Sequence, residues 1–290
     1  MEWPLKVQGR LVYESDVDEI RKCLSDHPDW HRTRLSVELC RNWDWRRPDG
    51  QLKDMACREY LRKLEKRDLI TLPPRRTSGA RRLPKIESVS IDQSPVCCDF
   101  SALGKVTVSD ARVNRDDERL FDGLVKDHHY LSFSRPVGQN MKYLVRSGEN
   151  RVLGCLLFGS AAWKAADRDR FIGWSADERE RNVNLITNNT RFLILPWVRV
   201  PNLASFALAS SLKRLNRDWF RRYGSTLAMV ETFVDTSRYL GTCYKAANWQ
   251  LVGQTKGRSR QDRNHALSVP VKDVYVYPLH KEFREVLRQA

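Results

Sequence analysis

Several features that would assign this sequence to a class of protein are missing from it. The seven cysteines include the adjacent pair Cys97-Cys98 but no C-x-x-C spacing, so neither a disulfide framework nor a zinc ribbon is expected, and no metal site. No P-loop, G-x-S-x-G or recognisable nuclease motif is present. The first residues do not begin a signal peptide, and no apolar run is as long as a bilayer is thick. We therefore expect a reduced, cytoplasmic protein without membrane contact.

Negative charge is scarce relative to positive charge. Lysine and arginine together number 51, against 36 for aspartate and glutamate, which gives a formal net charge of +15 and an isoelectric point near 9.7. Such an excess indicates a polyanionic partner, most often nucleic acid. The alternative is a soluble protein that is merely basic. The chain of 290 residues is long enough for two unequal parts.

The first part, residues 1–78, has three short helical patterns followed by a β element. The spacing of its apolar residues predicts helices over 16–26, 35–43 and 52–67, and a strand over 69–72. Pro73 and Pro74 end the strand, and two arginines follow them. This order is typical of a winged helix-turn-helix, whose third helix enters the major groove of DNA.

The third helix and the tip after it supply the expected DNA contacts. The candidate residues are Gln51, Lys53, Arg58 and Arg62 on the helix, with Arg75 and Arg76 at the tip. Helix residues near the N-terminus would reach base edges and the tip would meet phosphate. The alternatives are a solvated helix face or a protein-interaction module. From Arg58 to Lys85 the chain has ten basic and three acidic residues, and this local excess favours DNA.

Two further basic segments join this surface. Residues 79–101 lack sustained periodicity and are expected to form a basic linker between domains, in which Arg81 and Arg82 contact the DNA backbone. A polar loop after residue 255 contributes Lys256 and Arg258.

The second part, residues 102–290, alternates strand and helix patterns. The expected elements are a helix over 116–126, paired strands over 141–145 and 151–158, a polar helix over 176–184, a buried strand over 190–201, an amphipathic helix from 202, a strand over 227–234, a short helix over 241–248, a strand over 250–254, an edge strand over 272–277 and a helix over 281–289. Ser175 and Glu178 form a capping box for the polar helix. The chain is thus predicted to be α+β, with a mixed α/β second domain.

Two carboxylates of one predicted strand are candidates for chemistry. Glu231 and Asp235 lie four residues apart, so both side chains point to one face of the sheet. A carboxylate at a strand end is a usual position for a general base or a metal ligand. For the adjacent His128 and His129 we favour ordinary polar roles at a helix end over metal binding, because neighbouring residues rarely converge on one ion.

Arginine and aromatic side chains complete the expected pocket. Arg191 and Arg199 flank the central strand and either face a phosphate or pair with Glu231 or Asp235. Phe171 and Trp174 lie on either side of a glycine, where they either stack on a base or pack in the core. The pocket residues are therefore Arg191, Trp197, Arg199, Phe171 and Trp174.

The order of elements from residue 188 to 255 resembles the second half of a GNAT-type N-acyltransferase. Residues 195–205 stand where that family has its pyrophosphate loop, and residues 241–249 where it has a helix carrying a tyrosine. The resemblance implies that Tyr244 protonates a leaving thiolate; the alternative is a tyrosine that only packs. The family's loop is rich in glycine, whereas this loop has none and contains Leu203. Acyl-coenzyme A is therefore possible as a cofactor but not favoured, and no other cofactor is expected.

A second resemblance covers most of the chain. It is carried by the words Asp127-His128-His129-Tyr130-Leu131, Phe171-Ile172-Gly173-Trp174-Ser175, Asn189 to Val198, Glu231-Thr232-Phe233-Val234-Asp235 and Gly241-Thr242-Cys243-Tyr244. Together they resemble the DruA family of the Druantia anti-phage systems of bacteria, with related domains in transposase-like proteins. The resemblance implies a role in defence and partner subunits of the same system.

Three hypotheses follow. The first is a DNA-binding component of a defence system that holds duplex or single-stranded DNA and has a degenerate acyltransferase-like domain. The second is an active GNAT-type group transferase that modifies a nucleobase or a protein, using Glu231, Asp235 and Tyr244 as catalytic residues. The third is a transposase-associated module that recognises DNA.

Overall fold

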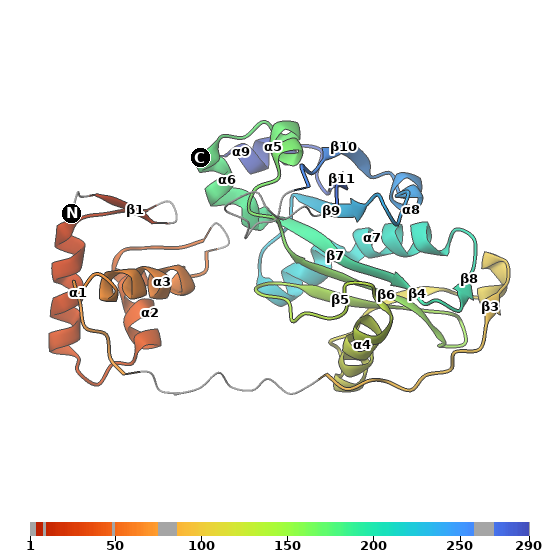
Figure 1. The fold of residues 1–290 in the computed structure, drawn as a ribbon, viewed down its shortest axis with the longest axis horizontal. Helices are drawn as coiled ribbons and strands as arrows, with labels where there is room; N and C mark the ends of the chain where they lie inside the picture. The colour runs from red at the N-terminus through yellow and green to blue at the C-terminus, as the bar shows by residue number, and fades with distance from the viewer. Residues whose placement is uncertain (1–3, 8–9, 48–49, 75–85, 258–269, 290) are drawn as a thin grey trace. The chain divides into compact units, whose positions relative to one another are not determined.

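Two compact units make up the chain in the computed structural model, residues 1–84 and residues 85–290. The structure describes residues 4–7, 10–47, 50–74, 86–257 and 270–289 (Figure 1). Arg75, Arg76, Arg81, Arg82 and Arg258, which we expect to contact DNA, lie outside these described residues. Each unit has its own hydrophobic core.

The first unit is a small helical domain preceded by a hairpin. Its elements are the antiparallel strands β1 (Leu5–Val7) and β2 (Arg10–Val12) and the helices α1 (Glu14–Asp26), α2 (Arg32–Asn42) and α3 (Asp54–Glu65). The three predicted helices are all present. They enclose a core that includes Ile20, Leu39 and Leu61, each almost fully buried. Helical periodicity was therefore a sufficient guide here.

The predicted strand over 69–72 is wrong. No strand follows α3 among the described residues of the first unit, and the hairpin precedes α1 instead. Ile70 and Leu72 are buried against the helices, while arginine side chains satisfy the neighbouring carbonyls: the Arg21 Nε donates to the Leu69 oxygen at 3.0 Å, and an Arg32 N–H to Pro73. Arginine donors thus take the carbonyl at the start of the segment and the one just after it. The winged-helix prediction is thus not confirmed.

A mixed seven-stranded sheet forms the centre of the second unit. The strands are β4 (Thr107–Asp110), β5 (Met141–Arg146), β6 (Val152–Ser160), β7 (Ile186–Ile194), β9 (Met229–Asp235), β10 (Gln250–Gln254) and β11 (Lys272–Pro278), in the order β10-β11-β9-β7-β6-β5-β4. Only the β7–β9 pair is parallel. The predicted edge strand over 272–277 lies between β10 and β9, so it is not at an edge.

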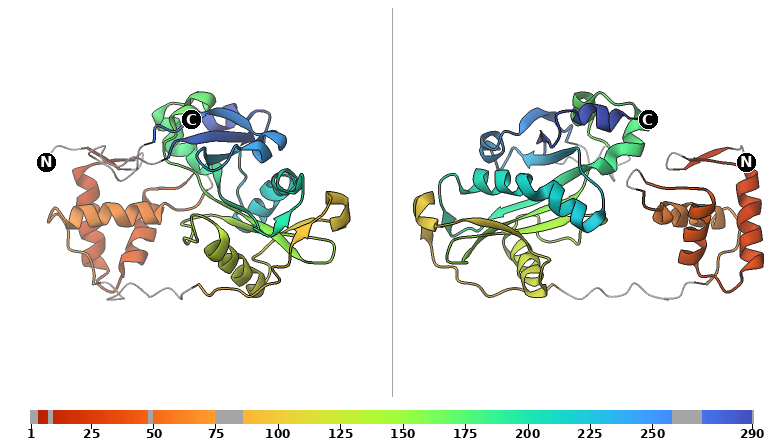
Figure 2. Two further views of the ribbon diagram at one scale, coloured as in Figure 1. Left: turned by 45° about the vertical axis from the view of Figure 1, so that its right-hand side comes forward. Right: turned by 180° about the vertical axis from the view of Figure 1, so that it is seen from behind.

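Helices cover both faces of this sheet (Figures 1 and 2). They are α4 (Arg115–His128), α5 (Ala166–Ile172), α6 (Ala176–Asn182), α7 (Leu203–Tyr223), α8 (Thr242–Ala246) and α9 (Phe283–Arg288), with short 3₁₀ turns at Phe100–Leu103 and Val183–Leu185. On β5, Lys142 reaches Asp122 of α4 and the adjacent Tyr143 reaches Asp218 of α7. Successive strand residues point to opposite faces, so α4 and α7 lie on opposite faces.

Local signals set the ends of several helices. Ser175 and Glu178 form the predicted capping box at the start of α6. Asn202, at φ 64°, precedes α7, and Gly224, at φ 70°, ends it in the left-handed conformation that glycine adopts without strain. Strand, helix, strand, short helix and strand therefore follow one another from β7 to β10, as the GNAT resemblance implies.

Part of the expected linker belongs to the second unit. The short strand β3 (Val96–Cys97) pairs in parallel with β8 (Val198–Arg199), directly after β7. The Phe100 ring lies 4.9 Å from the Phe206 ring in the first turns of α7. Apolar side chains in residues 86–101 pack against the core of the second unit. The sequence did not predict this packing, because the segment lacks periodicity.

Candidate functional site

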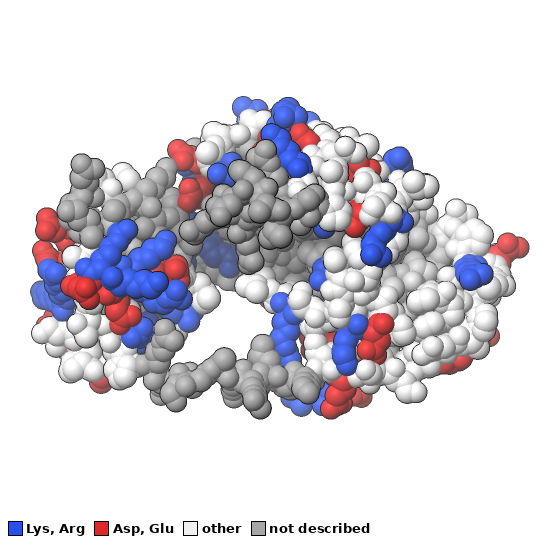
Figure 3. Space-filling view, viewed as in Figure 1, with Lys and Arg blue, Asp and Glu red and all other residues white. Residues whose placement is uncertain are grey.

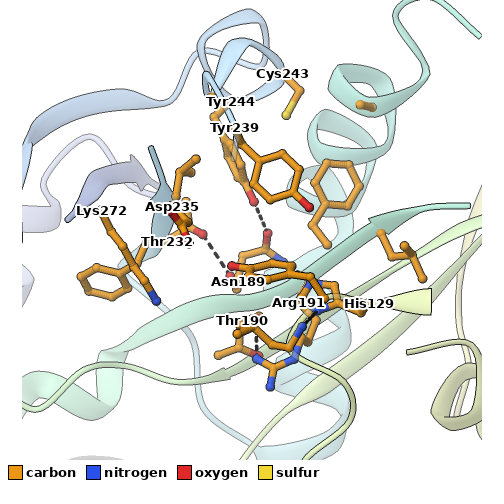
Figure 4. Close-up of a pocket in the computed structure, with 18 of the residues that line it drawn as sticks. His129, Asn189, Thr190, Arg191, Thr232, Asp235, Tyr239, Cys243, Tyr244 and Lys272 are labelled. Carbon is orange, nitrogen blue, oxygen red and sulfur yellow. Dashed lines mark hydrogen bonds between the residues drawn. The ribbon is translucent and has the colours of Figure 1, made fainter. Parts of the chain in front are cut away.

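A cavity of the second unit opens where β7 and β9 separate. The two strands pair only over Ile186–Asn188 and Met229–Glu231, and beyond these residues they diverge. A cavity of about 480 Å³ fills the split (Figure 4). Its walls come from residues 128–131 at the end of α4, 188–194 of β7, 232–235 of β9, 239–244 before and within α8, Ala204 and Lys272. This volume is in the usual range for small-molecule sites.

Asn189 fixes the geometry of the split. Thr232 donates its hydroxyl to the Asn189 carbonyl at 3.0 Å, and Tyr244 donates its hydroxyl to the Asn189 Oδ1 at 2.8 Å. In the β6–β7 ladder Leu157 pairs with Arg191 and Phe158 with Asn189, so Thr190 is an extra, bulged residue. The bulge lets Arg191 extend from β7 on the side away from Tyr244 (Figure 4).

Tyr244 lines the cavity with its hydroxyl already engaged. The side chain is buried, and its ring stacks on Tyr275 with 5.8 Å between the centroids. Burial raises the pKa of Tyr244, so the hydroxyl is protonated near neutral pH. The structure thus places Tyr244 at the cavity, where its hydroxyl supports Asn189.

Arg191 brings an unpaired positive charge to the cavity wall. Its guanidinium donates to the Ser132 carbonyl at 3.1 Å, the Thr190 carbonyl at 2.7 Å and the Ser134 hydroxyl at 3.3 Å. In the described part of the chain no carboxylate lies within 4.0 Å of it. Burial lowers the pKa of Arg191, although an arginine stays charged in proteins. The predicted pairing with Glu231 or Asp235 is therefore absent, and the charge faces neutral groups.

His129 is an uncharged neighbour of this arginine. Burial, together with the charge of Arg191, lowers the pKa of His129 to about 4. Its Nδ1 accepts the Leu131 backbone N–H at 3.1 Å, so in the neutral ring the proton is on Nε2. His129 therefore offers a neutral N–H donor near neutral pH.

Asp235 lies at the cavity end of β9. Ser237 donates to its Oδ1 through the hydroxyl at 2.6 Å and the backbone N–H at 3.1 Å, and these bonds lower the pKa of Asp235. Asp235 is thus an ionised carboxylate at the cavity, which fits its predicted position.

Glu231, by contrast, is not at the cavity. The carboxylate is fully buried and pairs with the fully buried Arg168 at 2.7 Å, while its other oxygen accepts the Ala162 N–H at 2.6 Å. Burial raises the pKa of Glu231, and the charge of Arg168 opposes this shift. The prediction of a cleft-facing Glu231 is wrong because α5 covers that part of the face. Sequence reasoning missed Arg168; its position between Asp167 and Asp169 was the available signal.

Four of the five predicted pocket residues do not line the cavity. Trp174 is buried and donates its indole N–H to Asp169 at 3.0 Å, beneath Arg168. Phe171 stacks on Phe283, Trp197 contacts His128, and Arg199 is exposed on β8. The alternative interpretation, core packing, is correct for Trp174. Arg191 alone of that set is a cavity residue.

The predicted DNA-contacting residues of α3 are partly neutralised. Arg58 pairs with Asp54 at 2.6 Å and Arg62 with Glu59 at 3.2 Å. Gln51 is exposed and Lys53 half-buried at the start of the helix, and Lys256 is exposed in the second unit. Figure 3 shows basic residues gathered on one face of the first unit with acidic residues among them.

Three other cations at the end of α3 have no carboxylate partner. Lys63, Lys66 and Arg67 are exposed, and in the described part of the first unit none forms an ion pair. The number of basic residues in the sequence includes these three cations. The structure is needed to show that they are unpaired whereas Arg58 and Arg62 form ion pairs.

The residues after β7 do not fit the phosphates of acyl-coenzyme A. A phosphate cradle needs free backbone N–H groups that a ligand can approach closely. Here Leu203 is buried and its N–H donates to the Val200 carbonyl at 3.4 Å. β8 is tied to β3, and Phe100 packs on Phe206 of the first helical turn. The loop is therefore built into the protein's own packing.

The described residues contain neither a cluster of metal ligands nor a membrane-spanning helix. Among residues 4–7, 10–47, 50–74, 86–257 and 270–289, no group of three His, Cys, Asp or Glu side chains is placed to hold a metal ion. Over the same residues, no helix combines the length and apolarity needed to cross a membrane.

Several solved structures of acetyltransferases are similar to this chain. A spermidine N-acetyltransferase from Vibrio cholerae in complex with CoA and spermine has 11% identity and a TM-score of 0.36, and the match covers 59% of this chain and 92% of that chain. An acetyltransferase of the GNAT family from Bacillus anthracis has 13% identity and a TM-score of 0.31, covering 48% and 66%.

Sequence comparison is more specific. No curated protein sequence matches the chain. The family described as Druantia protein DruA matches residues 104–269, more than half of the chain and nearly all of the cavity walls. This chain therefore belongs to the DruA family.

Proposed function

We propose that the chain is a DNA-binding component of a bacterial anti-phage defence system. Membership of the DruA family supports the role in defence and the presence of partner subunits. The observation that carries DNA binding is the group of exposed, unpaired cations at the end of α3, namely Lys63, Lys66 and Arg67. Exposed cations without an internal partner can replace the counterions of a phosphate backbone.

The rest of the charge distribution supports the same conclusion. The sequence continues from Arg67 towards Arg75, Arg76, Arg81 and Arg82 with few acidic residues, and the whole chain has a net charge of +15. Arg58 and Arg62 are already held by carboxylates, so their contribution to phosphate binding is smaller. The unpaired set, rather than the start of α3, is then the main phosphate-binding surface.

A charge-matched pair of variants tests this proposal. One variant replaces Lys63, Lys66 and Arg67 with alanine; the control replaces Arg41, Arg46 and Arg62, which are similarly exposed but paired with Glu38, Asp44 and Glu59. Fluorescence polarisation of the full chain with a labelled duplex would be measured from low to moderate salt. The first variant should weaken binding and lower the slope of log affinity against log salt by about three, one for each lost cation.

Two results would contradict the proposal. One is that neither duplex nor single-stranded DNA binds the unaltered chain at low salt, where phosphate contacts are strongest. The other is an equal loss in both variants, which would mean that only net charge matters. Competition with unrelated duplex separates this role from sequence-specific recognition by a transposase-associated module.

A further inference from the structure

Two cavities of the second unit contain a buried or half-buried cation. In a cavity beside α4, Lys142 is buried between two carboxylates, Glu118 at 2.9 Å and Asp122 at 2.6 Å. Its charge is satisfied internally. In the cavity between β7 and β9, Arg191 faces only neutral acceptors. An uncompensated half-buried cation favours a bound anion, so the cavity between β7 and β9 is a candidate ligand site.

Arg191 retains donors for such an anion. A guanidinium has five N–H groups in a planar fork. Three of them are used by Ser132, Thr190 and Ser134, which leaves two. These bonds also hold the side chain in one position, so little side-chain entropy is lost on binding. His129 lines the same cavity, and because its Nδ1 accepts the Leu131 N–H, it adds an Nε2–H donor. Two neighbouring groups that only donate suit a phosphate.

Aromatic side chains at the same cavity suit a flat ring. Tyr130 is 38% exposed and Tyr239 is 51% exposed, although both are large and both line the cavity. Their ring centroids are 5.7 Å apart, and the Arg238 guanidinium lies 5.2 Å from the Tyr130 ring. Exposed aromatics of this kind are stacking platforms for nucleobases.

The charges that line the cavity disfavour a positively charged ligand. Arg191 and Lys272 are positive, Asp235 is negative and His129 is neutral, so the wall has a net positive charge. A polyamine would be repelled by this wall. Asp235 cannot hold the phosphate, but it can accept an N–H from a base. We propose that the cavity between β7 and β9 binds a nucleotide, with the phosphate on Arg191 and the base on Tyr130 and Tyr239.

Truncated ligands test the two halves of the proposal on the unaltered full chain. Isothermal titration calorimetry would compare adenosine monophosphate with adenosine, which lacks the phosphate, and with ribose 5-phosphate, which lacks the base. The nucleotide should bind at least tenfold more tightly than either fragment, and spermidine should not bind. Equal affinity for nucleotide and adenosine, the absence of nucleotide binding, or tight binding of spermidine would each overturn the proposal.

Variants assign the contacts. Arg191→Met should weaken nucleotide binding at least tenfold and leave adenosine unchanged, whereas Tyr239→Ala should weaken both ligands that carry a base. Arg199→Met is the control, because Arg199 is exposed and outside the cavity, and it should change neither. Thermal melting shows which variants are folded. If Arg191→Met does not fold, the comparison of ligand fragments and the Tyr239→Ala variant still test the proposal. Unchanged nucleotide binding in folded Arg191→Met contradicts the proposed phosphate contact.

The nucleotide can be free or at the end of a strand, and one further comparison separates these sources. A short single-stranded oligonucleotide with a 5′-phosphate would be compared with the same strand without it. A preference for the phosphorylated strand that Arg191→Met abolishes identifies a strand end; binding of the mononucleotide alone identifies a free nucleotide. The variant lacking Lys63, Lys66 and Arg67 should keep its nucleotide affinity, so failure here is distinct from failure of the proposed DNA binding.

Discussion

Two arginines of the second unit are held in opposite ways. Arg168 is fully buried and contacts two carboxylates, Glu231 at 2.7 Å and Asp169 at 2.8 Å. Arg191 is half-buried and contacts two carbonyls and a hydroxyl. The first arrangement neutralises charge inside the protein and fixes α5 against β9. The second leaves charge available to a ligand. Counting basic residues in the sequence cannot distinguish these two uses of arginine.

Removing the paired arginine should have the largest effect on stability. Arg168→Met leaves the fully buried Glu231 carboxylate with the Ala162 N–H as its main partner. Breaking a buried ion pair in this way costs about 3–5 kcal/mol. Urea unfolding of the full chain, followed by tryptophan fluorescence, measures the change. Arg170→Met is the control, because its side chain is 78% exposed and its pair with Asp167 should contribute less than about 1 kcal/mol.

A second substitution sharpens the interpretation. Adding Glu231→Leu to Arg168→Met removes the unpaired carboxylate and should restore part of the lost stability. If the double variant were no more stable than the single one, lost packing rather than unpaired charge would be the cause. The buried charge of Glu231 would then matter less for stability than its ion pair with Arg168 indicates.

A smaller effect is expected at the cavity, and it depends on pH. The pKa of His129 is lowered to about 4 in the folded chain, against 6.5 for an exposed histidine. Between these values the unfolded chain binds a proton that the folded chain does not, so stability falls as the pH falls from 6.5 towards 4. The loss at pH 5 relative to neutral pH is about 2 kcal/mol at most.

His129→Asn tests this expectation. An asparagine oxygen can accept the Leu131 N–H as the Nδ1 does, but it does not titrate. The variant should lose less stability than the unaltered chain between pH 7.5 and pH 5 in urea unfolding. Equal losses of stability in the two proteins would show that His129 is not held neutral in the folded chain. The contrast between the neutral His129 and the ion pair of Arg168 would then no longer hold.

The sequence predicted local features well and long-range partners poorly. The capping box of Ser175 and Glu178 was predictable because its residues are three apart and its chemistry is local. Tyr244, Asp235 and Arg191 all line the cavity. The GNAT resemblance implied the place of Tyr244, whereas the alternative that pairs Arg191 with a carboxylate is wrong. The partner of Glu231 was not predictable, because Arg168 comes from a helix 63 residues away.

The failed strand at 69–72 has the same cause. Its β-like composition was real, but two arginines from α1 and α2 donate to the carbonyl at the start of the segment and the one just after it. The pairs of α3 are a different case, because Arg58 and Arg62 contact carboxylates four and three residues earlier on the same helix. Composition gives the number of charges, helical spacing indicates local partners, and tertiary structure is needed for distant ones.

The smallest effect is expected from Tyr244, whose hydroxyl is engaged with Asn189. Tyr244→Phe removes the donor to the buried Asn189 Oδ1 and should cost about 1–2 kcal/mol of stability. Tyr277→Phe is the control, since in the described residues the Tyr277 hydroxyl has no hydrogen-bond partner, and its loss should be nearly neutral. Both variants should keep nucleotide affinity within about threefold, because neither ring is removed. If Tyr244→Phe kept full stability but lost nucleotide binding, the Tyr244 hydroxyl would instead contact the ligand. Nucleotide binding in the cavity would then depend on this hydroxyl rather than on the unpaired charge of Arg191.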